Sequence, residues 1–77
     1  MKENILSFLA EIRPECDFEN SMNFIEEGLL DSFDIVSLVT SLDEEFKISI
    51  EGTDIIPENF ANLDSIERLL LKNGAKR

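Results

Sequence analysis

The sequence predicts an all-α protein: a small four-helix bundle with three longer helices, one short helix and a long packed first loop. The chain has 77 residues, which is enough for one hydrophobic core and too few for a second. Apolar residues recur at helical spacing in three separate segments. The one alternating stretch, residues 47–50, is too short and isolated to found a sheet. We therefore expect residues 1–77 to form a single domain.

The first helix is predicted over residues 2–13. Its inward face is an apolar stripe at the spacing i, i+3, i+4, i+7, made of Ile5, Phe8, Leu9 and Ile12. Pro14 ends the helix, because the proline ring cannot continue a helical backbone.

The following stretch, residues 14–30, has little helical periodicity and is long for a connection. It nevertheless carries large apolar side chains, namely Phe18, Met22, Phe24, Ile25, Leu29 and Leu30. We expect a loop of this composition to pack across the core rather than to hang free.

The strongest helical pattern covers residues 32–46. One side of its helical wheel is apolar, formed by Ile35, Leu38, Val39, Leu42 and Phe46. Asp31 is suited to the N-cap, and Asp34, the third residue of the helix, can complete a capping box with it. Leu30 and Ile35 can pack together across the helix start as a hydrophobic staple.

The last third of the chain predicts two more helical elements. Residues 53–60 are expected to contain a short turn of helix, with Pro57 as a first-turn residue. Asn62 then caps a helix over residues 63–72, whose inward residues are Leu63, Ile66, Leu69 and Leu70. Asn73 and Gly74 are a stop signal for that helix.

Composition excludes several classes of function. Seven Lys and Arg against 17 Asp and Glu give a net charge of −10, which disfavours nucleic acids and anionic membrane surfaces as partners. The chain has no histidine, so it has no Ser-His-Asp or Cys-His catalytic pair and no His-ligated metal site. Its acidic runs, such as Asp43-Glu44-Glu45, lack the residue order of a calcium loop. We expect a protein that is not an enzyme and binds no specific metal.

The sequence also predicts a cytoplasmic monomer. The single cysteine, Cys16, cannot form an internal disulfide and fits a reducing compartment. Residues 1–4 lead directly into a helical pattern without the apolar core of a signal peptide. No stretch approaches the roughly 18 consecutive apolar residues of a membrane span.

Ser32 is the sharpest candidate for chemistry. It lies at the start of the strongest helix, directly after Asp31, where the first backbone N–H groups of the helix favour a phosphate. With no histidine in the chain, no internal base of the usual kind can activate its hydroxyl, so a separate protein must catalyse any reaction at its oxygen. The alternative is that Asp31 and Ser32 only start the helix, since both residue types are favoured there.

The residues around Ser32 resemble an acyl carrier protein. The resemblance is carried by Gly28-Leu29-Leu30-Asp31-Ser32, Asp34-Ile35-Val36, Leu38-Val39, Leu42 and Asp43-Glu44-Glu45-Phe46. It continues through Ile48-Ser49-Ile50, Pro57-Glu58-Asn59-Phe60 and Leu63-Asp64-Ser65-Ile66, and so covers nearly the whole chain. It implies a bundle of acyl-carrier type with 4′-phosphopantetheine attached to Ser32 by a phosphopantetheinyl transferase, and with Asp31 as a transferase contact. The thiol of that group would hold acyl or aminoacyl groups as thioesters and present them to successive enzymes.

A docking strip follows Ser32 along the same helix. Apolar contact framed by negative charge suits brief, salt-sensitive binding to basic surfaces of acyl-loading and acyl-transfer enzymes. The candidate docking residues are Phe33, Asp34, Val36, Thr40, Asp43 and Glu44. For Phe33 and Val36, packing beneath the preceding loop is an equally good interpretation, and for the acidic residues a solvated helix face is the simpler one.

Three readings of the function stay open. The common fatty-acid carriers have Leu or Met after the modified serine and Glu and Met further along, where this chain has Phe33, Ser37 and Thr40. These departures argue against fatty-acid synthase as the main client. An acyl carrier of fatty-acid, lipid or specialised biosynthesis and a D-alanyl carrier of teichoic acid assembly are the first two readings. The third reading is an unmodified acidic helical adaptor that binds a basic partner.

Overall fold

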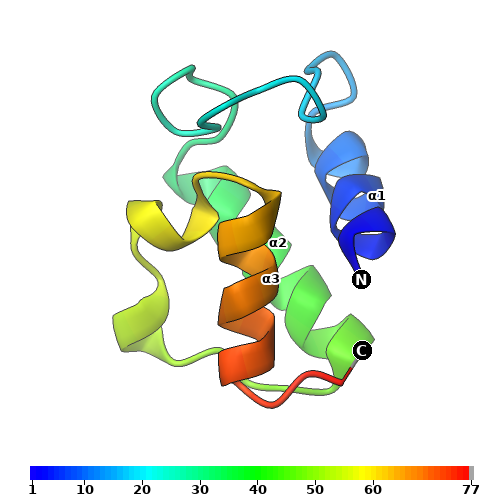
Figure 1. The fold of residues 1–77 in the computed structure, drawn as a ribbon, viewed down its shortest axis with the longest axis vertical. Helices are drawn as coiled ribbons and strands as arrows, with labels where there is room; N and C mark the ends of the chain where they lie inside the picture. The colour runs from blue at the N-terminus through cyan, green and yellow to red at the C-terminus, as the bar shows by residue number, and fades with distance from the viewer. Residues whose placement is uncertain (77) are drawn as a thin grey trace.

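The computed structural model describes residues 1–76 and is built from helices. Three α-helices, α1 (Lys2–Ile12), α2 (Ser32–Phe46) and α3 (Leu63–Lys72), are joined by loops and by two 3₁₀ helices, η1 (Gly52–Asp54) and η2 (Pro57–Phe60) (Figure 1). No strand occurs in residues 1–76. The all-α bundle is therefore confirmed, and α2 and α3 begin and end at the predicted residues.

The predicted short turn within residues 53–60 is present as η2. The chain adds a second short helix, η1, which Ile55 and Ile56 separate from η2. Ile56 is extended, with φ −127° and ψ 152°, because a residue before proline is pushed out of the helical region. Pro57 then begins η2 as its first residue.

The core lies between the three α-helices and the long loop. The most completely buried side chains include two from each α-helix and two phenylalanines from outside them: Ile5, Leu9, Leu38, Leu42, Ile66, Leu70, Phe24 and Phe60. Four residues predicted to face inward are only partly buried at the edge of this core, namely Phe8, Ile12, Phe46 and Leu63. α1 packs against both α2 and α3.

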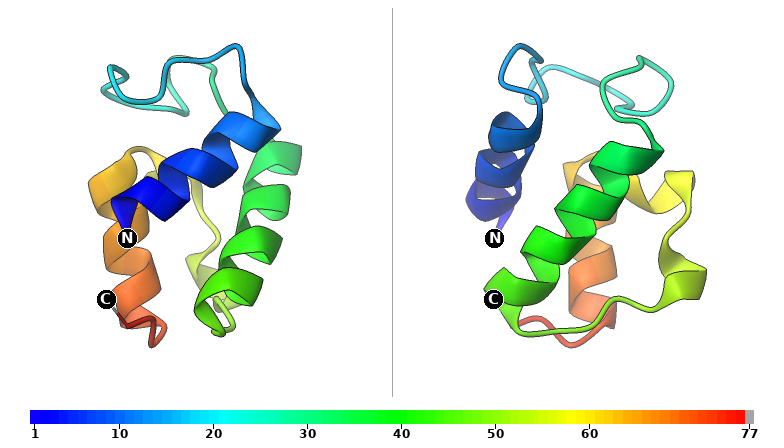
Figure 2. Two further views of the ribbon diagram at one scale, coloured as in Figure 1. Left: turned by 90° about the vertical axis from the view of Figure 1, so that its right-hand side faces the viewer. Right: turned by 180° about the vertical axis from the view of Figure 1, so that it is seen from behind.

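The long loop packs across the end of the bundle at which α2 begins, as predicted (Figure 2). Phe18 and Phe24 are buried and meet edge to face, with ring centroids 5.1 Å apart. The backbone amide of Phe24 donates to the carbonyl of Ala61, which ties the loop to the segment before α3. Met22 is the exception to the predicted packing. Its side chain is 86% exposed, while its backbone amide donates to the carboxylate of Glu27.

Acidic repulsion opposes this fold, and we predict that salt relieves it. The net charge is −10, and ion pairs such as Lys2–Asp64 and Lys72–Asp54 are exposed on at least one side, so screening them costs little. Added sodium chloride, or a millimolar divalent cation, should raise the melting temperature by screening the repulsion among carboxylates. The measurement is thermal unfolding followed by circular dichroism across a salt titration. A melting temperature that stays flat would contradict the prediction.

Candidate functional site

Two aspartates fix the start of α2 by a reciprocal pair of hydrogen bonds. Asp31 is the N-cap, and its Oδ1 atom accepts from the backbone amide of Asp34 at 2.9 Å. The Oδ2 atom of Asp34 accepts in turn from the backbone amide of Asp31 at 3.1 Å. The predicted capping box is therefore confirmed, and it satisfies two of the backbone donors that a helix start leaves without partners.

Ser32 is the first residue of α2 and is exposed to solvent. The capping box spans it, so the backbone on both sides of Ser32 is fixed while its side chain is accessible. The first backbone amides of the helix and its dipole favour a negative group beside Ser32. These features fit a serine that accepts a phosphate-linked group.

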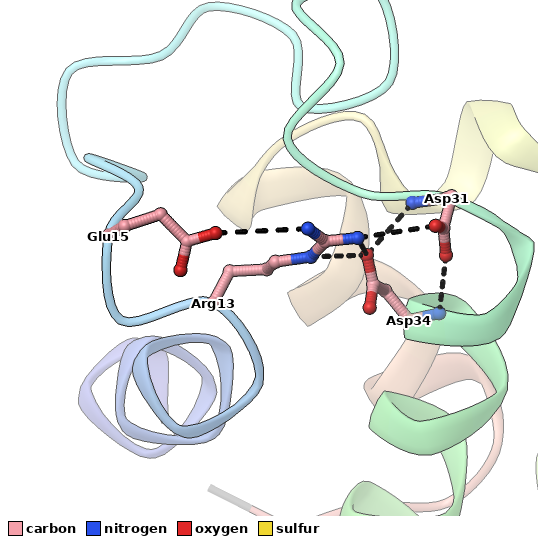
Figure 3. Close-up of polar contacts among 4 residues, drawn as sticks. All are labelled: Arg13, Glu15, Asp31 and Asp34. Carbon is pink, nitrogen blue, oxygen red and sulfur yellow. Dashed lines mark hydrogen bonds and ion pairs between the residues drawn. The ribbon is translucent and has the colours of Figure 1, made fainter.

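Arg13 joins this site from the end of α1, which the sequence did not predict. Its Nε and Nη2 atoms each lie 2.9 Å from Oδ2 of Asp34, and Nη2 also lies 3.2 Å from Oδ2 of Asp31 (Figure 3). The remaining Nη1 atom faces Glu15 at the longer distance of 3.8 Å. Arg13 is the C-cap residue of α1, so one side chain connects the end of α1 with the start of α2.

The hydrogen bonds of the site favour its charged forms. The pKa of Asp31 lies below its ordinary value, chiefly because its carboxylate accepts the amide hydrogen bond of Asp34, with the positive charge of Arg13 as a further cause. The hydrogen bond to Asp34 raises the pKa of Arg13. Because the pKa of Asp31 is lowered on folding, its contribution to stability is present at neutral pH and is lost as the pH falls through that lowered pKa.

Two of the predicted docking residues instead have structural partners. Asp34 is only 9% exposed and its carboxylate faces Arg13, so the structure removes it from the docking surface. Asp43 is half-buried, and its Oδ1 atom accepts from the backbone amide of Ile50 at 3.0 Å. That bond holds the segment after α2 against the helix. Asp43 is therefore an unsuitable place to test docking by charge reversal.

The other predicted docking residues form one exposed face of α2. Phe33 is 84% exposed and Val36 60%, so neither packs beneath the loop. Thr40 and Glu44 are also exposed, and the spacing of the four residues places them along one side of the helix. The Thr40 hydroxyl donates to the carbonyl of Val36, which leaves its methyl group to extend the apolar part of the face. We call Phe33, Val36, Thr40 and Glu44 the α2 outer face.

In residues 1–76, neither a metal-ion site nor a membrane span accompanies this site. Cys16 is a free, half-buried cysteine that packs against the core. In residues 1–76, no group of three or more acidic or cysteine side chains is placed to hold a metal ion. Over the same residues, every helix is too short or too polar to cross a bilayer.

Known proteins match this chain over most of its length. The family model described as a phosphopantetheine attachment site matches residues 3–70. Aminoacyl carrier protein 1 of Bradyrhizobium diazoefficiens is 36% identical over 71 residues, which cover 92% of this chain and 69% of that protein. No solved structure is significantly similar to the chain.

Proposed function

This chain belongs to the family of carrier proteins that have a phosphopantetheine attachment site, and from that membership we propose that Ser32 is its attachment point. The family is non-catalytic: its members carry 4′-phosphopantetheine and interact with the transferase that installs it and with enzymes that handle acyl groups. Under this proposal residues 1–77 are a single carrier domain, of which Arg77 lies outside the described residues. We also propose that the protein is a cytoplasmic monomer.

The observation that carries the proposal is the accessibility of Ser32 at a rigid helix start. A transferase must reach the hydroxyl, and Ser32 is exposed at the first position of α2. The serine is also held in place, because Asp31 and Asp34 fix the backbone on either side. When attached, the group supplies a thiol that forms thioesters. Ser32 holds its phosphodiester, and the helix start favours the negative charge.

We propose further that the cargo is an aminoacyl group. The relative at 36% identity is named an aminoacyl carrier protein. The α2 outer face argues against a fatty-acyl cargo, because Phe33 and Thr40 depart from the residues that fatty-acid carriers usually have there. A fatty-acyl carrier is the competing reading, and a D-alanyl carrier is one form of the aminoacyl reading.

The cargo can be identified on the protein isolated from the organism that encodes it. Acid quenching preserves thioesters, and the intact mass then gives the group held on the thiol. We expect the mass of an amino acid, releasable by hydroxylamine. A fatty-acyl mass would contradict the aminoacyl cargo and leave the carrier function intact. An unmodified chain would contradict the carrier proposal itself and favour the adaptor reading.

Charge reversal at Glu44 tests docking through the α2 outer face. Glu44 is exposed, so Glu44→Lys should leave the helix content and melting temperature near those of the wild type. At low salt it should slow modification by the transferase several-fold, because the acidic part of the face no longer attracts a basic partner, and added salt should shrink the difference. Glu11→Lys, the same change at an exposed residue of α1, is the control. Equal rates for the two variants at low salt would show that Glu44 is only solvated surface.

A further inference from the structure

We propose that Arg13 is a positioning residue for the modification of Ser32, because its guanidinium offsets the negative charge of Asp31 and Asp34 beside the acceptor hydroxyl. This inference rests on the proposed function, in which Ser32 receives the phosphopantetheine. It concerns a residue far from Ser32 in the sequence, which reaches the site only through the packing of α1 against α2.

The capping box creates an electrostatic problem for a serine that must accept a phosphate. Asp31 directly precedes Ser32 and Asp34 follows two residues later, and each carboxylate is fixed at the helix start by a backbone amide. Two negative charges there oppose the attraction that a helix N-terminus otherwise exerts on an anion. The carboxylates that cap the helix thus weaken the attraction of its N-terminus for an anionic substrate.

Arg13 offsets part of the negative charge of Asp31 and Asp34 by direct contact with both carboxylates. Its Nη2 atom contacts both carboxylates, at 3.2 Å from Asp31 and 2.9 Å from Asp34, and its Nε atom is also 2.9 Å from Asp34 (Figure 3). The guanidinium is planar and permanently charged, which suits it to this double contact. Its side chain is 37% exposed, so the guanidinium is also in contact with solvent.

The reaction that benefits is a phosphoryl transfer. The Oγ atom of Ser32 attacks the phosphorus of coenzyme A that bears the pantetheine. The bond from that phosphorus to the bridging pyrophosphate oxygen breaks, and 3′,5′-adenosine diphosphate leaves with the electron pair. The serine proton passes to a base of the transferase. All the phosphates involved are anionic, so offsetting part of the carboxylate charge favours their approach to Ser32.

The test compares modification rates of Arg13→Gln, Arg13→Lys and wild type, with coenzyme A and one phosphopantetheinyl transferase. We expect kcat/KM to fall about tenfold in Arg13→Gln, the size of effect expected from one uncompensated charge at a partly exposed site. Arg13→Lys keeps the charge and should retain at least about a third of the wild-type rate. High salt should bring the ratio of Arg13→Gln to wild type closer to one, since screening replaces the missing cation. Lys72→Gln, which removes a cation paired with Asp54 at 2.9 Å, is the charge-matched control and should react as the wild type does.

Three results would overturn the inference. The first is an Arg13→Gln rate equal to that of Lys72→Gln. The second is a deficit of Arg13→Gln that does not change with salt, which indicates a purely structural role. The third is an Arg13→Lys variant as slow as Arg13→Gln.

Circular dichroism at the assay temperature establishes that each variant is folded. If Arg13→Gln is not folded there, the ratio of Arg13→Lys to wild type decides, and a value below a third contradicts the proposal. Failure of the wild type itself to be modified would be a different outcome, because it would refute the carrier function rather than the role of Arg13.

Discussion

Replacing Ser32 by alanine is expected to abolish attachment of phosphopantetheine while leaving the fold intact. The side chain of Ser32 is exposed, and the hydrogen bonds that start α2 come from Asp31 and Asp34, so the variant keeps its helix cap. Alanine is also a better helix former than serine. The melting temperature should therefore stay close to that of the wild type, while the mass gain after incubation with coenzyme A and a transferase disappears completely.

Ser7→Ala is the matched control for this experiment. Ser7 is an exposed serine within α1, so its loss removes the same hydroxyl from a helix without touching the site. This variant should be modified to the same extent as the wild type. Modification of Ser32→Ala would place the attachment point elsewhere. A cell that tolerates Ser32→Ala without loss of function would favour the adaptor reading.

Replacing Asp34 by alanine is expected to lower the stability of the domain more than any other substitution proposed for this site. The Asp34 carboxylate accepts from the Asp31 amide at 3.1 Å and from two guanidinium nitrogens of Arg13 at 2.9 Å, and it is almost fully buried. Losing half of a capping box together with partly buried charged hydrogen bonds should lower the free energy of unfolding by about 2–3 kcal/mol. A domain of this size has only about 3–5 kcal/mol in total. The melting temperature should fall by roughly 10–20 °C.

Thermal unfolding of Asp34→Ala beside Asp64→Ala measures this effect. Asp64 is likewise an aspartate in the first turn of a helix and is likewise ion-paired, to Lys2, but its side chain is exposed. Exposed ion pairs contribute little, so Asp64→Ala should shift the melting temperature far less. Equal shifts for the two variants would show that the contacts of Asp34 with Arg13 add nothing to the stability of the domain.

The elements that the sequence predicted correctly are those determined by neighbouring residues. α2 begins where Asp31 can cap it, and α3 begins where the Asn62 side chain accepts from the Ser65 amide at 2.8 Å. Both signals lie within four residues of the helix start, so the sequence displays them directly. The turn that begins at Pro57 was predicted within residues 53–60, whereas η1 before it was not.

The parts of the site that the sequence did not predict depend on contacts between distant residues. Arg13 lies 18 residues before Asp31 and 21 before Asp34, and only the packing of α1 on α2 brings them together. At the end of a predicted helix, Arg13 had the pattern of an ordinary surface cation. Asp34 is buried by that same packing. Because the local sequence does not show this packing, Asp34 was predicted on the docking surface.

The intact mass of the wild-type protein after incubation with coenzyme A and a broad-specificity transferase tests most directly whether Ser32 makes this protein a carrier. We predict a gain of one phosphopantetheine, and peptide mapping should place it on the segment that contains Ser32. No gain with several transferases, on a chain that circular dichroism shows to be folded, would contradict the carrier function. Asp31 and Ser32 would then be only the start of a helix in an acidic adaptor protein.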